Sequence, residues 1–159
     1  KSVAVDFLFS HLDTLKWSND PKPLVEYLRT ATLTSKDMAK LKQTQYLPCE
    51  NDTSRMFAPH ELYLPDRELR VFSFLRLLQW PSSQDEITER TQNGRFLVSL
   101  GMKVHPPLIQ LFKYISDQVD EDGLRIRCLE FVSKRLGSNG VYQKEYGRIN
   151  RADMIKLKL

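Results

Sequence analysis

The sequence predicts a mainly α-helical protein, a compact multi-helix domain with short extended segments and proline-marked corners. Apolar residues recur every three or four positions in most segments, as they do on one face of a helix. The eight prolines mark corners between these segments. A hydrophobic content of 41% with 28% charged residues is typical of a globular chain.

Residues 1–35 are predicted to form an N-terminal helical segment, and whether it packs on the rest stays open. Apolar side chains follow helical spacing over residues 3–15. Asp20 and Pro21 interrupt the pattern, and a short amphipathic helix then ends near Thr30. A helical core module follows over residues 36–147, and residues 148–159 form a basic C-terminal segment.

The first part of the core module is predicted to alternate short helices with extended pieces. Thr34 or Ser35 is expected to cap a helix that buries Met38 and Leu41, because a side-chain oxygen accepts an unpaired N–H of the first turn. Residues 45–48 are expected to be extended, because a proline disfavours helix in the preceding residue. A single helical turn is predicted between two prolines over residues 58–65.

A longer helix is predicted over residues 66–80, capped by Asp66 and carrying four apolar residues on one face: Leu69, Phe72, Leu75 and Leu78. A short helix around residues 96–100 is predicted to end at Gly101 in left-handed geometry.

The remaining helices are marked by their flanking residues. Pro106 and Pro107 favour the start of a helix over residues 108–115. The acidic residues 120–122 suit the N-terminus of a helix over residues 124–136, with Gly137 as its stop. Its apolar pattern includes Ile126, Cys128, Leu129 and Val132, and Cys128 is expected to be a small buried apolar residue. Residues 141–146 and 152–159 fit no single element.

Positive charge gathers at the C-terminal end. The net charge is +4, with seven basic side chains against two acidic ones from residue 134 onward. This composition favours contact with phosphate or an acidic protein surface, and a solvated helix face is the plainer interpretation. The two tyrosines of this segment would stack on the bases of single-stranded nucleic acid. The candidate contact residues are Lys134, Arg135, Tyr142, Lys144, Tyr146, Arg148, Arg151, Lys156 and Lys158.

Motifs for catalysis or cofactor binding are not found in the sequence. It has no glycine-rich phosphate loop, and its three histidines and two cysteines lack metal-ligand spacing. No catalytic, cofactor-binding or metal-binding residue is therefore predicted. A hydrolase would need a Ser or Cys beside a histidine held by a third group. With its cysteines unpaired, the chain is expected to be intracellular, and no apolar run is long enough to span a membrane.

Four phrases, taken in order, resemble a family of large proteins. Residues 41–50 (LKQTQYLPCE) and 58–65 (APHELYLP) resemble consecutive phrases of sacsin-like proteins. Residues 69–70 (LR) with 78–81 (LQWP), then 94–101 (GRFLVSLG) followed by Pro106 and Pro107, are similar to phrases of fungal relatives that are also like the plant NO VEIN protein. The resemblance covers residues 36–147.

The resemblance implies a place in a larger protein. Such proteins carry an N-terminal ATP-binding domain of the Hsp90 (GHKL) type with helical regions downstream, and this chain is similar to the downstream part. None of the ATPase motifs occurs here, so no nucleotide-binding residue carries over. The expected function is a non-catalytic scaffold or interaction module, chaperone-like in its contact with proteins, including other domains of the parent chain.

The physical means expected for this role is an exposed apolar groove. Candidate residues are Phe74, Leu75, Leu77, Leu78 and Trp80, although most of these also suit a core. The alternative function is a basic helical module that binds nucleic acid through the C-terminal Lys and Arg cluster.

Overall fold

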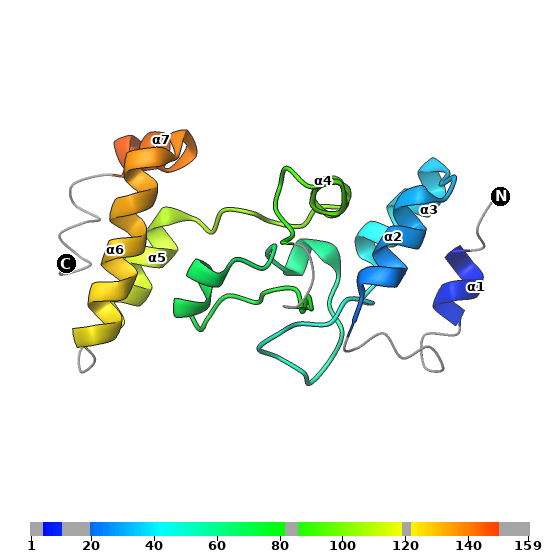
Figure 1. Ribbon diagram of the computed structural model, residues 1–159, viewed down its shortest axis with the longest axis horizontal. Coiled ribbons are helices and arrows are strands. Elements are labelled where there is room, and N and C mark those ends of the chain that lie inside the picture. Colours follow the sequence, from blue (N-terminus) through cyan, green and yellow to red (C-terminus); the bar gives the residue numbers. More distant parts are fainter. Residues whose placement is uncertain (1–4, 11–19, 82–85, 119–121, 150–159) are drawn as a thin grey trace. The chain divides into compact units, whose positions relative to one another are not determined.

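The structure is a computed structural model that describes residues 5–10, 20–81, 86–118 and 122–149. These residues form seven α-helices and two 3-10 helices, and none of them belongs to a β-strand (Figure 1). Short extended pieces are joined by isolated bridges instead. The predicted helical class with short extended segments is confirmed. In the described ranges, no helix combines the length and the apolar character needed to cross a bilayer.

The first three helices are α1 (Val5–Ser10), α2 (Lys22–Thr30) and α3 (Ser35–Gln43). The rest of the helix predicted over residues 3–15 lies outside the described residues. Of the two caps predicted for α3, Thr34 is the one used. Its hydroxyl oxygen accepts a hydrogen bond from the backbone N–H of Asp37 at 3.1 Å, and the Asp37 carboxylate accepts the Thr34 N–H at 2.9 Å. This reciprocal pair satisfies two N–H groups that the helix leaves unpaired.

Backbone hydrogen bonds between distant segments replace helices in the middle of the chain. Leu47 and Phe57 exchange two of them, at 3.0 and 2.8 Å. The extended conformation predicted for residues 45–48 is therefore confirmed. The single helical turn predicted after residue 58 is the 3-10 helix η1 (Pro59–Glu61).

The prediction of a long helix over residues 66–80 is wrong. Only the 3-10 helix η2 (Arg67–Val71) forms there. Further along, the N–H of Leu78 donates to the carbonyl of Tyr63 at 2.9 Å, and the N–H of Tyr63 donates to the carbonyl of Arg76 at 2.9 Å. These bonds use backbone groups that a helix would pair four residues apart, so the segment is extended and its leucines are buried through tertiary contacts.

Helix α4 (Gln92–Ser99) ends as the sequence predicts. Gly101 has a φ of +103°, the left-handed conformation that glycine adopts without a steric penalty. The chain then turns back, and the N–H of Met102 donates to the carbonyl of Leu97 at 3.1 Å.

The last three helices of the described chain are α5 (Leu108–Asp117), α6 (Asp122–Ser138) and α7 (Gly140–Arg148). Pro107 directly precedes α5, as predicted. Helix α6 runs one residue beyond Gly137, the expected stop. Asn139 then caps α7, because its side-chain oxygen accepts the N–H of Val141 at 2.9 Å. The segment 141–146, which fitted no single element, is thus helical.

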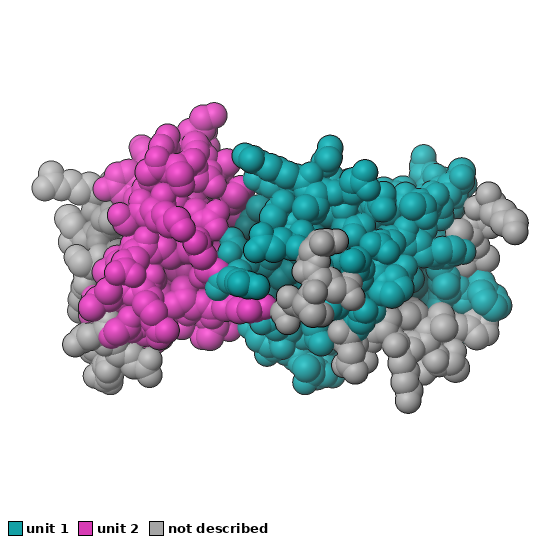
Figure 2. Space-filling view, in the orientation of Figure 1, with its two compact units in different colours: residues 1–67, 74–104 teal, residues 68–73, 105–159 magenta. Residues whose placement is uncertain are grey.

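The chain divides into two compact units, residues 1–67 with 74–104 and residues 68–73 with 105–159 (Figure 2). In unit 1, one core joins Val5 of α1, Leu28 of α2, Leu41 of α3 and Leu97 of α4. Helices of the predicted N-terminal segment therefore share a core with α3, while the domain boundaries predicted at residues 35 and 147 stay predictions.

Unit 2 has a core of its own, built by α5, α6 and α7 with the short segment 68–73. Cys128 of α6 is fully buried, as the sequence predicts, and Ile115 of α5 is also fully buried in the core. The rings of Phe72 and Phe131 meet edge to face, with centroids 5.2 Å apart. Such aromatic contacts add to the free energy of apolar burial.

Candidate functional site

Lys134 and Arg135, the first two residues of the predicted nucleic-acid contact, form ion pairs with Glu68. The Lys134 ammonium lies 2.6 Å from one carboxylate oxygen of Glu68, and the Arg135 guanidinium lies 3.3 Å from the other. The hydrogen bond from Lys134 lowers the pKa of Glu68 below its usual value. Both cations thus contribute to the structure of unit 2.

Tyr142 is a core residue. Its ring is buried, and its hydroxyl donates a hydrogen bond to the carbonyl of Pro106 at 3.0 Å. The ring of His105 lies against it edge to face, with centroids 5.7 Å apart. A base cannot stack on a ring in this position without opening the unit.

The remaining described residues of the basic cluster lie on different sides of α7. Lys144 and Arg148 are exposed and four positions apart, so they share one side of the helix. Tyr146, which is 51% exposed, lies on a different side by the helical repeat. Arg151, Lys156 and Lys158 lie outside the described residues. Within the described chain, the structure therefore brings Lys144 and Arg148 together without an aromatic platform between them.

The apolar candidates before residue 81 are mostly core residues. Leu75, Leu77 and Leu78 are buried, so they line no exposed groove. Trp80 is half-buried and packs against the core of unit 1. Phe74 is 42% exposed.

An apolar surface occurs instead on α6. Ile126 is 55% exposed and Leu129 is 42% exposed. The buried side of the same helix carries Cys128, Phe131 and Val132. Helix α6 is therefore apolar on two sides, only one of which packs within unit 2.

A signal for this second surface was present in the sequence. Apolar residues occupy positions 126, 128, 129, 131, 132 and 136, and these are spread too widely around a helix to form one stripe. Such a distribution indicates a helix that is buried on more than one side, or one that has an exposed apolar side.

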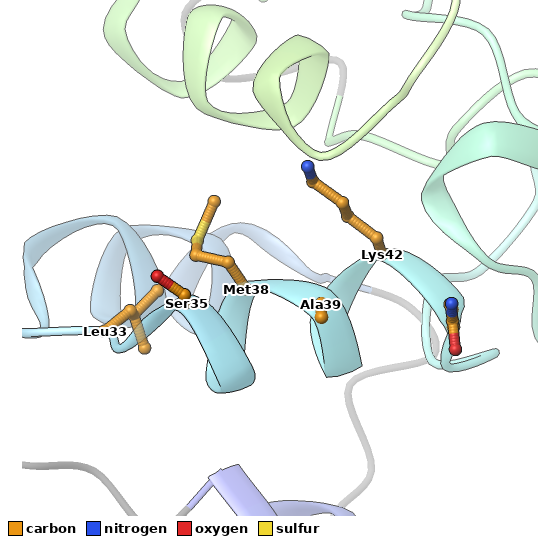
Figure 3. A pocket seen from close by; sticks show the side chains of 6 residues that line it. Leu33, Ser35, Met38, Ala39 and Lys42 are labelled. Carbon is orange, nitrogen blue, oxygen red and sulfur yellow. The ribbon is translucent and has the colours of Figure 1, made fainter.

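A shallow hollow of about 490 Å³ runs along α3 in unit 1. Its lining is half apolar and half polar: Leu33, Ser35, Met38, Ala39, Lys42 and Gln43. Figure 3 shows Met38 and Lys42 extending from the same side of the helix. Both Ser35 and Lys42 are exposed at its surface, so the hollow holds no desolvated polar group that would orient a small ligand.

Other titratable side chains of unit 1 make local structural contacts. Arg55 forms two hydrogen bonds with the carboxylate of Glu61, at 3.1 and 3.4 Å, and these lower the pKa of Glu61. Burial raises the pKa of the Cys49 thiol, which lies 3.2 Å from the side-chain oxygen of Asn51. His60 contacts the carbonyl of Lys42 at 3.3 Å. In the described ranges, no three His, Cys, Asp or Glu side chains gather as metal ligands do.

Comparison with known proteins places the chain in a family. Neither the curated proteins nor the solved structures give a match. A family model described as "Protein of unknown function (DUF3684)" matches residues 1–155, which is nearly the whole sequence. This chain therefore belongs to the DUF3684 family.

Proposed function

We propose that the chain is a non-catalytic helical scaffold and interaction module that binds protein through unit 2. The observation that carries the proposal is the exposed apolar side of α6, where Ile126 and Leu129 lie next to each other in the helical repeat. Exposing such residues together is unfavourable in water, and their burial against a partner would recover about 1.5–3 kcal/mol for each side chain fully covered.

The polar contacts of the two units support a scaffold role. Glu61 accepts hydrogen bonds from Arg55 and from the N–H of Ala58, which joins a loop to the start of η1. The carboxylate of Glu68 forms ion pairs with Lys134 and Arg135, and these contacts join η2 to α6. In both cases the pKa shift has a local structural cause.

The resemblance of residues 36–147 to sacsin-like and NO VEIN-like proteins supports a wider proposal. The module would belong to the helical region downstream of an Hsp90-type ATP-binding domain, inside the cell. Its partner would then be a protein surface, including another domain of the same parent chain. The chaperone-like aspect of the proposal is contact with apolar surface, which α6 offers.

Nucleic-acid binding is the weaker alternative. Lys134 and Arg135 would have to leave Glu68 before they bound phosphate, and Tyr142 would have to leave the core. Lys144 and Arg148 alone supply two charges, whereas strong phosphate binding generally uses several.

Photo-crosslinking from α6 tests the proposal. A photoreactive phenylalanine analogue replaces Ile126 in the intact parent protein, and the same analogue replaces the exposed Lys113 of α5 as a matched control. We expect one defined adduct from position 126 and none of that mass from position 113. The substitution Leu129→Glu should suppress the adduct, because it places a charge in the apolar contact.

Either of two results would refute the proposal. Equal adduct patterns from positions 126 and 113, or an adduct that Leu129→Glu leaves unchanged, would show that the apolar side of α6 makes no specific contact. Peptide mapping of the adduct identifies the other polypeptide and separates a copy of this chain from a different protein or domain.

A further inference from the structure

The exposed side of α6 has the spacing of a coiled-coil seam. Ile126, Leu129, Ser133 and Leu136 are separated by three, four and three residues. This is the spacing of the a and d positions of a heptad, with Ile126 and Ser133 at a and Leu129 and Leu136 at d. Ser133 is exposed and Leu136 is half-buried. The four side chains thus form one stripe along two heptads of the helix, on the side away from Cys128.

The charges beside this seam are complementary to those of a second copy. Arg125 occupies the g position before Ile126, and Glu130 occupies the e position after Leu129. In a parallel two-stranded contact, a g side chain reaches the e side chain five residues further along the other helix. Arg125 of each copy would then meet Glu130 of the other, which gives two ion pairs related by the two-fold axis.

The antiparallel arrangement lacks this match. There g positions face g positions and e positions face e positions, so Arg125 of one copy would not meet Glu130 of the other. Within the described chain, neither residue has an ion-pair partner inside its own unit. The charge pattern therefore favours the parallel orientation.

We propose that α6 is a self-association surface that pairs in parallel and in register with α6 of a second copy of this chain (Figure 1). The proposal rests on the interaction role argued above and names the partner. Ile126, Leu129 and Leu136 supply the apolar contact, and Ser133 is a polar interruption that weakens it. Two heptads make a short seam, so the association is reversible and depends on concentration.

The first test measures mass against concentration for the 159-residue chain by analytical ultracentrifugation. We expect a monomer–dimer equilibrium. Ser133→Leu should tighten it about tenfold or more, because it adds a buried leucine from each copy. Leu129→Glu should abolish the dimer. Ile109→Glu is the matched control, since Ile109 is also exposed, at 41%, but lies on α5.

The second test uses charge reversal, which leaves the core of unit 2 intact. Arg125→Glu and Glu130→Arg should each weaken self-association about tenfold, because each turns two attractions into repulsions. An equimolar mixture of the two variants should form a mixed dimer, since both cross-pairs are then attractive. The chain carrying both substitutions should dimerise like the original.

Three results would overturn the proposal. The first is a monomer at every concentration even with Ser133→Leu. The second is a dimer that Leu129→Glu leaves intact. The third is a variant mixture that associates no better than either variant alone. If the crosslink from position 126 joins a different polypeptide, the interaction role stands and self-association fails; if no specific crosslink forms, the interaction role itself fails.

Discussion

Gly94, in the first turn of α4, is a position where adding one methyl group should destabilise the fold. A Cβ atom built there would overlap the carbonyl oxygen of Thr88 and would lie 2.6 Å from its carbonyl carbon. It would also lie 2.9 Å from the hydroxyl oxygen of Thr91. Since the nearest obstacle is backbone, rotation of a side chain cannot relieve the overlap, and the turn from Thr88 to Thr91 must move.

The cost follows from the hydrogen bonds of that turn. The Thr91 hydroxyl donates to the Thr88 carbonyl at 2.9 Å and accepts the N–H groups of Thr88 and Gly94, each at 3.2 Å. Losing the cap and the turn bonds costs about 3 kcal/mol. Replacing glycine by alanine within a helix stabilises the helix by about 1 kcal/mol. The net effect of Gly94→Ala is a destabilisation of about 2 kcal/mol.

The assay is amide hydrogen exchange along α4, combined with urea unfolding. We expect the protected amides of α4 to exchange about thirtyfold faster in Gly94→Ala than in the original chain. Gly137→Ala is the matched control, because no atom lies within 4 Å of a Cβ built at Gly137 in α6. That substitution should stabilise α6 by about 0.5–1 kcal/mol. If Gly94→Ala proves neutral or stabilising, the packing of Thr88 against Gly94 is wrong.

Three further perturbations test other contacts. Tyr142→Phe removes the buried hydrogen bond to Pro106 and should destabilise unit 2 by about 1–2 kcal/mol in urea unfolding; no change would contradict the buried hydroxyl. Because the folded pKa of Glu61 is lowered, its contribution is present above the ordinary value of 4.5 and is lost as pH falls through the lowered value. The stability difference between Glu61→Gln and the original chain, at most about 1 kcal/mol, should therefore shrink from neutral pH to about pH 3. If nucleic acid is the partner, reversing Lys144 and Arg148 should lower the salt slope of filter binding by about two, and an unchanged slope excludes these contacts.

Local signals were enough to predict several elements. Thr34 caps α3, and Gly101 ends α4 with a positive φ. Pro107 precedes α5, as the sequence predicts. Each of these features depends on residues within about one helical turn, so the conformational preference of the residue itself decides the outcome.

Contacts between distant residues are not visible in the sequence pattern. The leucines over residues 66–80 have helical spacing, but the N–H of Leu78 finds the carbonyl of Tyr63, fifteen residues away in sequence. Lys134 and Arg135 look like free charges in a basic segment, and they meet Glu68, far earlier in the chain. Spacing along the sequence carries no information on which segment will lie opposite.

The sequence by itself determined that this chain is mainly helical, where several of its helices begin and end, and that Cys128 is a small buried apolar residue. The tertiary structure decided which apolar residues are buried and which polar ones are already paired. Ile126 and Cys128 are both apolar residues of one helix, and only the placement of α5 and α7 leaves the first exposed and the second buried. The physical reason is that helix capping is a local equilibrium, whereas burial depends on the packing of elements that are distant in sequence.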